Sequence, residues 1–301
     1  MSITATIIQV IALVILAPLV QGIVKNTKGR LQSRRGPGYF QPYFDFVKFL
    51  AKDSVVSPTV SWVFHFAPYI YFATAIGAAA LVPTIFTETN GQFDNLFILV
   101  YLLALGRFFL AIASLDAGSS FGGMGGSREM FVSVLVEPAL MITLFTVAIS
   151  ANSTVLSAMA SNAASEPISL STVLAAIAFL IITVAETGRI PVDNPDTHLE
   201  LTMIHEGMVL EYSGRSVGLI FWAAAIKQLV FILLLIKLFI PWDLPGFDSN
   251  VMSAVSMFTK VLIMAVLLAC IESSTNKMRL FRVPGLMVAA GCLSLLALVA
   301  Q

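Results

Sequence analysis

Residues 185–212 read AETGRIPVDNPDTHLELTMIHEGMVLEY and follow an apolar run, 172–184, that has the length and texture of a membrane helix. Charged groups near membrane depth are costly and persist mainly where they face a polar cavity, a partner or each other. Pro191 and Pro195 end the helix, so the acids that follow lie on irregular backbone, which protein or water must satisfy. The stretch therefore predicts an acid-lined polar cavity at the membrane edge. Its ionisable residues are Glu186, Arg189, Asp193, Asp196, Glu200, Glu206 and Glu211.

The composition of the whole chain is that of a membrane protein. Of its 301 residues, 58% are hydrophobic and only 11% are charged, and the mean hydropathy is +0.91. Soluble domains have about 25% charged residues. We therefore predict an all-α polytopic membrane protein, with one integral membrane domain over residues 1–301. The first 24 residues contain no Lys or Arg before a long apolar run, which favours a first span over a cleaved signal peptide.

Eight segments approach the roughly 20 residues that a spanning helix needs. They run near 3–24, 62–86, 95–114, 129–150, 171–190, 216–240, 251–272 and 283–300. In the first loop, Phe44, Phe46, Val47, Phe49 and Leu50 follow Pro42 with charged residues between them. This pattern predicts a short amphipathic helix at the membrane interface, either as a lipid-facing anchor or as the roof of a cavity.

The distribution of Lys and Arg predicts the orientation of the chain. The first, third, fifth and seventh loops or their edges contain basic residues, whereas the second, fourth and sixth contain none. Because cytoplasmic loops are enriched in Lys and Arg, the odd loops are predicted to be cytoplasmic and both termini outside. On this face we expect basic residues to dock a partner. The candidates are Arg34, Arg35, Arg128, Arg189 and Arg215.

The third loop, 115–131, is rich in glycine (LDAGSSFGGMGGSREMF). No Gly-Lys-Ser/Thr follows it, so it does not predict a phosphate-binding loop. Glycines there instead permit close approach of the backbone to a partner or a cavity. Cys270 and Cys292 lack metal-ligand spacing and are interpreted as small core residues. No metal, haem or iron–sulfur site is expected in this chain, and no nucleic-acid partner.

The remaining chemistry consists of ionisable side chains in or beside the spans. Glu129 and Glu137, eight residues apart on one helix, lie about 80° apart around its axis and are able to border one channel. Lys227 is the best candidate for a buried partner of a carboxylate, whereas His198 and His205 are interpreted as solvated loop residues. Such groups predict proton or ion handling, with helix-locking ion pairs as the structural alternative. The pathway candidates are Arg107, Glu129, Glu137, Glu186, Asp193, Glu200, Glu206, Glu211 and Lys227.

Several motifs together resemble one family of membrane subunits. ETGRIPVD at 186–193, with Glu200-Leu201 and Glu211-Tyr212, is similar to the signature E-T-N-R-x-P-F-D … E-L … E-Y. RGPG at 35–38 followed by Gln41-Pro42, and the spacing from Arg128 to Glu137, match as well. The family comprises the quinone-site membrane subunit of respiratory complex I and its counterpart in group 4 nickel–iron (NiFe) hydrogenases, including formate hydrogenlyase. LDAGSSF at 115–121 and GSRE at 126–129 resemble the hydrogenase branch.

The resemblance implies an anchor subunit of the hydrogenase-4 or formate hydrogenlyase type. It implies that Glu137, Glu186, Asp193, Glu200 and Glu211 line a polar passage, and that Arg35 and Arg189 lie at the docking face. The implied partners are the NiFe large and small subunits, a ferredoxin-like iron–sulfur subunit and antiporter-like membrane subunits. The NiFe centre and iron–sulfur clusters would belong to those partners, with this chain in the cytoplasmic (inner) membrane of a prokaryote.

Three functions remain open from the sequence. The first is an anchor that couples hydrogenase chemistry to proton or sodium translocation. The second is the quinone-site subunit of a complex I-like NADH or ferredoxin:quinone oxidoreductase. The third is a purely structural anchor through which no ion passes.

Overall fold

The computed structural model describes residues 3–84, 94–194, 203–242 and 250–301. The described part is helical and has no β-strand. The α helices are α1 (Ile3–Leu31), α2 (Gln41–Ala51), α3 (Trp62–Leu81), α4 (Leu96–Asp116), α5 (Ser120–Ser150), α6 (Leu156–Ser165), α7 (Leu170–Glu186), α8 (His205–Val209), α9 (Gly214–Phe239), α10 (Asn250–Ser274) and α11 (Val283–Val299). A 3₁₀ turn, η2 (Leu280–Arg282), precedes α11.

The predicted fold class is confirmed. Within the described ranges, 7 helices are long and apolar enough to cross a membrane, and α7 is a shorter apolar helix. Together these eight correspond to the eight predicted spans, and the predicted interfacial helix is α2. Two boundaries differ markedly. The first helix continues to Leu31, beyond its apolar run, and the fourth begins at Ser120 instead of 129.

Short polar side chains begin four of the spanning helices. Ser61, Asn95, Ser119 and Ser169 each accept a hydrogen bond from a backbone N–H in the first turn of α3, α4, α5 and α7. Such side chains satisfy N–H groups that have no partner inside the helix. These caps fix the residue at which each helix begins.

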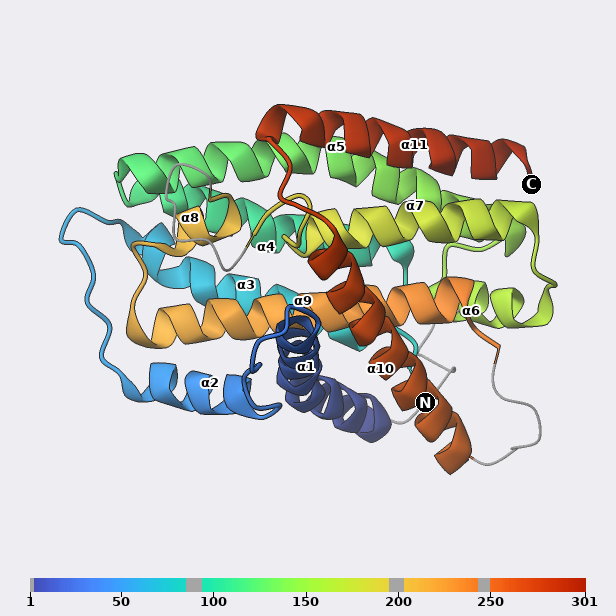
Figure 1. The fold of residues 1–301 in the computed structure, drawn as a ribbon, viewed down its shortest axis with the longest axis horizontal. Coiled ribbons are helices and arrows are strands. Elements are labelled where there is room, and N and C mark those ends of the chain that lie inside the picture. The colour runs from blue at the N-terminus through green and yellow to red at the C-terminus, as the bar shows by residue number, and fades with distance from the viewer. Residues whose placement is uncertain (1–2, 85–93, 195–202, 243–249) are drawn as a thin grey trace.

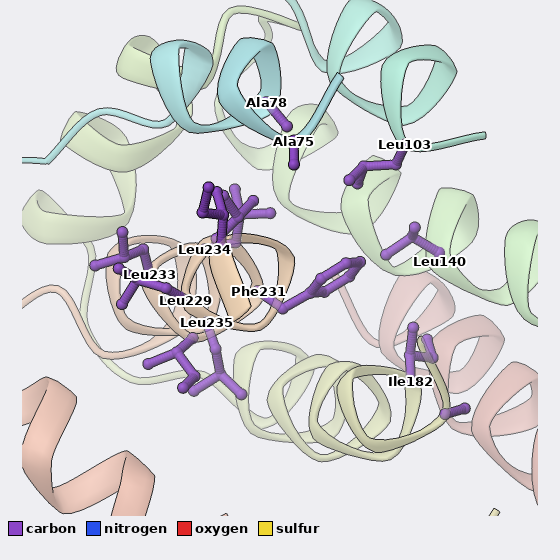
Figure 2. Close-up of a cluster of buried hydrophobic side chains, with 14 of the residues drawn as sticks. Ala75, Ala78, Leu103, Leu140, Ile182, Leu229, Phe231, Leu233, Leu234 and Leu235 are labelled. Carbon is purple, nitrogen blue, oxygen red and sulfur yellow. The ribbon is translucent and has the colours of Figure 1, made fainter. Parts of the chain in front are cut away.

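Helix α9 is the centre of the bundle. It is buried on nearly all sides because its residues are apolar all round its axis. Figure 1 shows it with α3 and α7 on one side and α1 and α2 on the other, while α10 runs diagonally across it. Phe231 and neighbouring leucines of α9 point towards residues of α3, α4, α5 and α7 (Figure 2). This apolar core fixes the positions of α3, α4, α5 and α7. It thereby also positions the polar side chains that these helices carry.

Helix α2 packs on α9 through aromatic side chains. Phe46 stacks on Trp222 with ring centroids 5.7 Å apart, and Phe49 lies 6.0 Å from Phe221. The opposite face of α2 exposes Phe44 and Val47. An exposed apolar face on an amphipathic helix is what lipid contact requires, so the structure favours the lipid-facing interpretation of α2.

The glycine-rich segment is the first part of α5, which corrects its prediction as a loop. Its glycines permit the expected close approach, and the neighbour is α8. A Cβ atom added at Gly125 would lie 2.8 Å from the carbonyl carbon of Gly207 and 2.9 Å from the nitrogen of Met208. Contact of this kind requires glycine, so tertiary packing compensates for the poor helix propensity of the segment.

We expect Gly125→Ala to destabilise the protein by about 1–3 kcal/mol, because the new methyl group would overlap backbone atoms that cannot move aside. Gly123→Ala is the matched control on the same helix. There the nearest atom to an added Cβ is a Leu115 side-chain carbon at 3.8 Å, and the gain in helix propensity of up to about 1 kcal/mol remains. The measurement is the thermal stability of the detergent-purified protein. Equal behaviour of the two variants would contradict the packing assigned to α8.

The connection between the fourth and fifth spans contains a helix, α6, for which the sequence made no prediction. One further expectation was wrong. Cys270 and Cys292 are exposed on α10 and α11 instead of lying in the core. Both helices lie at the outside of the bundle (Figure 1). Apolar residues on their outer faces therefore point away from the protein, as these two cysteines do.

Candidate functional site

Arg107 is at the centre of a group of buried charges that we call the Arg107 cluster. It extends from the middle of α4, and its guanidinium contacts Glu129 at 3.7 Å, Glu137 at 3.1 Å and Glu186. Ser133 accepts a hydrogen bond from it as well. Glu186 also pairs with Lys227 of α9 at 2.8 Å. Four helices, α4, α5, α7 and α9, therefore each contribute charged side chains to one site.

The carboxylates of this cluster form a gradient of exposure. The side chain of Glu186 is 2% exposed and that of Glu129 is 18% exposed, whereas the side chain of Glu137 is 40% exposed on the outer side of α5. The three carboxylates outnumber the two cations, Arg107 and Lys227, by one. A carboxylate in excess is free to take up or release a proton without leaving a buried cation unpaired.

A helix-terminating turn directs the next charged residues inward. Gly188 has a positive φ of 60°, and its N–H bonds the carbonyl of Ala185, while the N–H of Arg189 bonds that of Val184. These two bonds form a Schellman motif, in which glycine permits the left-handed conformation. The chain therefore turns back at the end of α7, and the side chains of Arg189 and Asp193 become buried.

Glu272 of α10 is the centre of a second group, the Glu272 cluster. Its carboxylate lies 3.2 Å from Lys28 of α1 and 3.4 Å from Arg189. Arg189 also donates to Gln228 at 2.6 Å. Gln228 follows Lys227 in α9, so the two clusters meet on adjacent residues of the central helix.

Asp193 joins this region to α8 and to the segment before η2. Its carboxylate accepts hydrogen bonds from the backbone N–H of His205 at 3.1 Å and from Lys277 at 2.8 Å. Beside it, burial raises the pKa of Glu206 above its usual value, and the nearby negative charge of Asp193 adds to this effect, while His205 opposes it. Glu206 is thus a carboxyl group that holds its proton more readily than a solvated one.

A small cavity lies beside the Arg107 cluster. Its volume is about 40 Å³, which is room for one water molecule. The lining combines ionisable and small residues, namely Tyr71, Glu129, Glu186, Thr187, Gly188, His205, Ala224 and Lys227. In the described residues, no group of three or more His, Cys, Asp or Glu side chains is arranged to hold a metal ion.

The predicted pathway residues divide into several groups. Arg107, Glu129, Glu137, Glu186 and Lys227 meet in the Arg107 cluster, and Lys227 has the carboxylate partner predicted for it. Asp193 and Glu206 lie beside His205. Glu211 is exposed, and its place along a polar passage stays a prediction. Glu200, Asp196 and His198 lie outside the described residues.

The predicted docking residues do not share one environment. Arg34, Arg35 and Arg215 are exposed. Arg128 is half-buried and donates to the carbonyl of Met203 at 3.0 Å, which fastens α5 to the segment before α8. Arg189 is buried in the Glu272 cluster. Its prediction as a docking contact is therefore corrected, because the turn at Gly188 directs it into the protein.

Sequence reasoning missed four members of the site. Lys28, Glu272 and Lys277 are absent from the candidates named from the sequence, and each has a charged partner in the structure. His205 was interpreted as a solvated loop residue, but it begins α8 and borders the cavity. Two opposite charges near the ends of the first and seventh spans, Lys28 and Glu272, were a signal that could have suggested contact between α1 and α10.

Fold and site define the chain as a multi-pass membrane protein with buried charge clusters between its spans. The chain belongs to the NADH dehydrogenase family, whose model matches residues 3–300. It is 35% identical over 286 residues to formate hydrogenlyase subunit 4 of Escherichia coli K12, covering 93% of this chain and 92% of that protein. The resemblance inferred from the sequence is therefore confirmed.

Two further relatives and one solved structure agree. Hydrogenase-4 component C of E. coli K12 is 34% identical over 278 residues, covering 90% of this chain and 87% of that protein. An NADH-quinone oxidoreductase subunit from Syntrophotalea carbinolica is 30% identical over 265 residues, covering 78% of this chain and 79% of that protein. A chain of the archaeal membrane-bound sulfane sulfur reductase, a respiratory membrane complex, has the same fold, with a TM-score of 0.82 at 17% identity over 97% of this chain and 98% of that one.

Proposed function

We propose that this chain anchors a hydrogenase module in the membrane and couples its electron transfer to translocation of protons or sodium ions. Two of its relatives, both from E. coli, are named as formate hydrogenlyase and hydrogenase-4 proteins. Nickel–iron large and small subunits, a ferredoxin-like iron–sulfur subunit and antiporter-like membrane subunits would be its partners. The hydrogenase and iron–sulfur subunits would hold the NiFe centre and the iron–sulfur clusters on the cytoplasmic side of an inner membrane. Both termini of this chain would lie on the other side of that membrane.

The exposure of Glu137 carries the proposal. A side chain that is 40% exposed on a spanning helix faces lipid unless a partner covers it, and a carboxylate there is costly in lipid. Through Arg107 the same carboxylate is linked to Glu186 in the interior. A partner membrane subunit placed on α5 would therefore receive protons or ions from the centre of this chain.

We expect Glu137→Gln to lower ion translocation per redox turnover several-fold and to leave assembly intact, because glutamine retains the shape but carries no exchangeable charge. The measurement is ion uptake into inverted membrane vesicles, normalised to hydrogen-linked electron transfer in the same vesicles. Glu166→Gln is the matched control, since Glu166 is an exposed glutamate at the end of α6 and is not a pathway candidate. Full translocation in an assembled Glu137→Gln complex would contradict the proposal and favour a purely structural anchor.

The second candidate is a quinone-site subunit, which the relation to an NADH-quinone oxidoreductase supports. The cavity that Glu129 and Glu186 border has a volume of about 40 Å³, whereas ligand pockets have volumes of about 300 Å³ or more. This cavity is therefore too small for a quinone ring. Mild-detergent purification of the complex through this chain separates the two candidates. Nickel with hydrogen-dependent viologen reduction supports the first candidate, and quinone reductase activity without nickel supports the second.

A further inference from the structure

His205 borders the small cavity beside the Arg107 cluster and has a buried ring nitrogen without a partner in the described part of the chain. Its Nε2 atom is inaccessible to solvent and has no hydrogen-bond partner among the described residues. The backbone N–H of the same residue is fixed on Asp193, and its ring lies 6.5 Å from that of Tyr71 between centroids. A buried polar atom of this kind calls for an ordered water or a proton-transfer partner.

The groups that face His205 come from every neighbouring element. They are Tyr71 of α3, Glu129 of α5, Glu186 of α7 and Lys227 of α9 at the cavity, with Asp193 and Glu206 beside the histidine. Glu186 is already bound by Arg107 and Lys227. Glu129 approaches Arg107 only at 3.7 Å, beyond hydrogen-bond distance, so its carboxylate is the acceptor available to the cavity.

We propose that the cavity binds one water molecule that transfers protons between His205 and Glu129, and that the ion moved by the complex is therefore a proton and not sodium. This inference rests on the proposed function. In the transfer, Nε2–H of the imidazolium gives its proton to the water oxygen, and the water gives one of its own protons to the Glu129 carboxylate. The products are neutral imidazole, a protonated glutamate and an unchanged water. Imidazole is suited to such exchange near neutral pH.

The same cavity is unsuited to sodium. A bare cation needs several oxygen ligands to replace its hydration shell, and about 40 Å³ leaves room for about one water-sized body. The ammonium of Lys227 lies in the cavity wall, with the Arg107 guanidinium on the same carboxylate. A sodium ion would add one positive charge beside them, whereas a proton passed from His205 to Glu129 leaves the total charge around the cavity unchanged.

The test uses the complete complex in inverted membrane vesicles. We expect His205→Gln, which retains a hydrogen-bonding side chain but does not titrate, to lower the protons moved per redox turnover by about tenfold or more, because a positioned proton-transfer group contributes about 10²–10⁴-fold to a rate. Hydrogen-linked electron transfer in viologen assays should stay near the unsubstituted level. In the unsubstituted complex, proton uptake should be unchanged when sodium is replaced by potassium.

Controls make each outcome decisive. His65→Gln is the matched control, because His65 is an exposed histidine on α3 outside the cavity, and it should retain full proton uptake. Ala224→Val fills the cavity without changing a titratable group, and it should reduce proton uptake even if His205→Gln fails to assemble. Unaltered uptake in assembled His205→Gln or Ala224→Val, or sodium-dependent translocation, would overturn the inference and leave the proposed function intact. An unsubstituted complex that moves no ion would overturn both.

Discussion

Glu186→Ala is expected to lower the stability of the folded protein by about 3–5 kcal/mol, the usual result of removing one partner from a buried charge network. Glu186 bonds both Arg107 and Lys227, and all three side chains are buried. Without the carboxylate, Lys227 loses its ion-pair partner and remains beside the Arg107 guanidinium. A loss of this size is a large part of the about 5–15 kcal/mol that stabilises a typical protein. The measurement is the amount of protein in the membrane and its thermal stability in detergent.

Two comparisons identify the cause of that loss. Glu166→Ala is the control, because Glu166 is an exposed residue at the end of α6 and an exposed charge contributes about 0–1 kcal/mol. The double variant Glu186→Gln with Lys227→Met removes a cation together with the carboxylate, and it should recover part of the lost stability. If Glu186→Ala were as stable as Glu166→Ala, the Arg107 cluster would not hold the helices together.

The second large effect is expected for Glu272→Ala. The carboxylate joins Lys28 of α1 to Arg189 beyond α7, and its side chain is 1% exposed. Its removal leaves Lys28 without that ion pair and Arg189 without this carboxylate, although Arg189 still donates to Gln228, at a cost of about 3–5 kcal/mol. Because α1 and α10 lie side by side at the edge of the bundle (Figure 1), we expect the loss to appear first as proteolysis at these two helices.

Glu272→Gln distinguishes charge from shape in this cluster. Glutamine fills the same volume, so a loss close to that of Glu272→Ala would assign the effect to the ion pairs. Lys28→Met together with Glu272→Gln should recover stability, since the ammonium that pairs with the carboxylate is removed together with it. A fully stable Glu272→Ala variant would show that apolar packing alone fixes α10.

The spans were predictable because the bilayer leaves a segment few choices. An apolar run of about 20 residues can satisfy its backbone in lipid only as a helix or a closed barrel, and the eight segments accordingly correspond to helices. Lys227 and Arg107 were predictable as site members for a related reason. Each is a single charge inside an apolar run, and such a charge needs a partner whatever the details of the fold.

Other features of the fold and the site could not be predicted, because they depend on tertiary contacts that the hydrophobic periodicity of the sequence does not encode. The glycines near Gly125 indicate a loop by propensity, but packing against α8 makes them helical. Arg189 has the composition of a docking residue, and a left-handed glycine one position earlier directs it inward. His205 lies in a segment whose apolar residues have no regular spacing, so the sequence does not predict its surroundings. A backbone hydrogen bond to Asp193, which only the tertiary structure shows, holds it at the cavity.

The shortness of α7 has an electrical consequence. Its 17 residues extend about 25 Å, less than the about 30 Å of a hydrocarbon core, and polar side chains continue from its end at Glu186. We therefore expect the insulating layer to be thinner here than in the surrounding lipid, so that the membrane voltage falls over a shorter path. One elementary charge crossing 100 mV changes in energy by about 2.3 kcal/mol. A proton displaced near Glu186 thus experiences a steeper field than one displaced equally far in lipid, and its movement should respond more strongly to voltage.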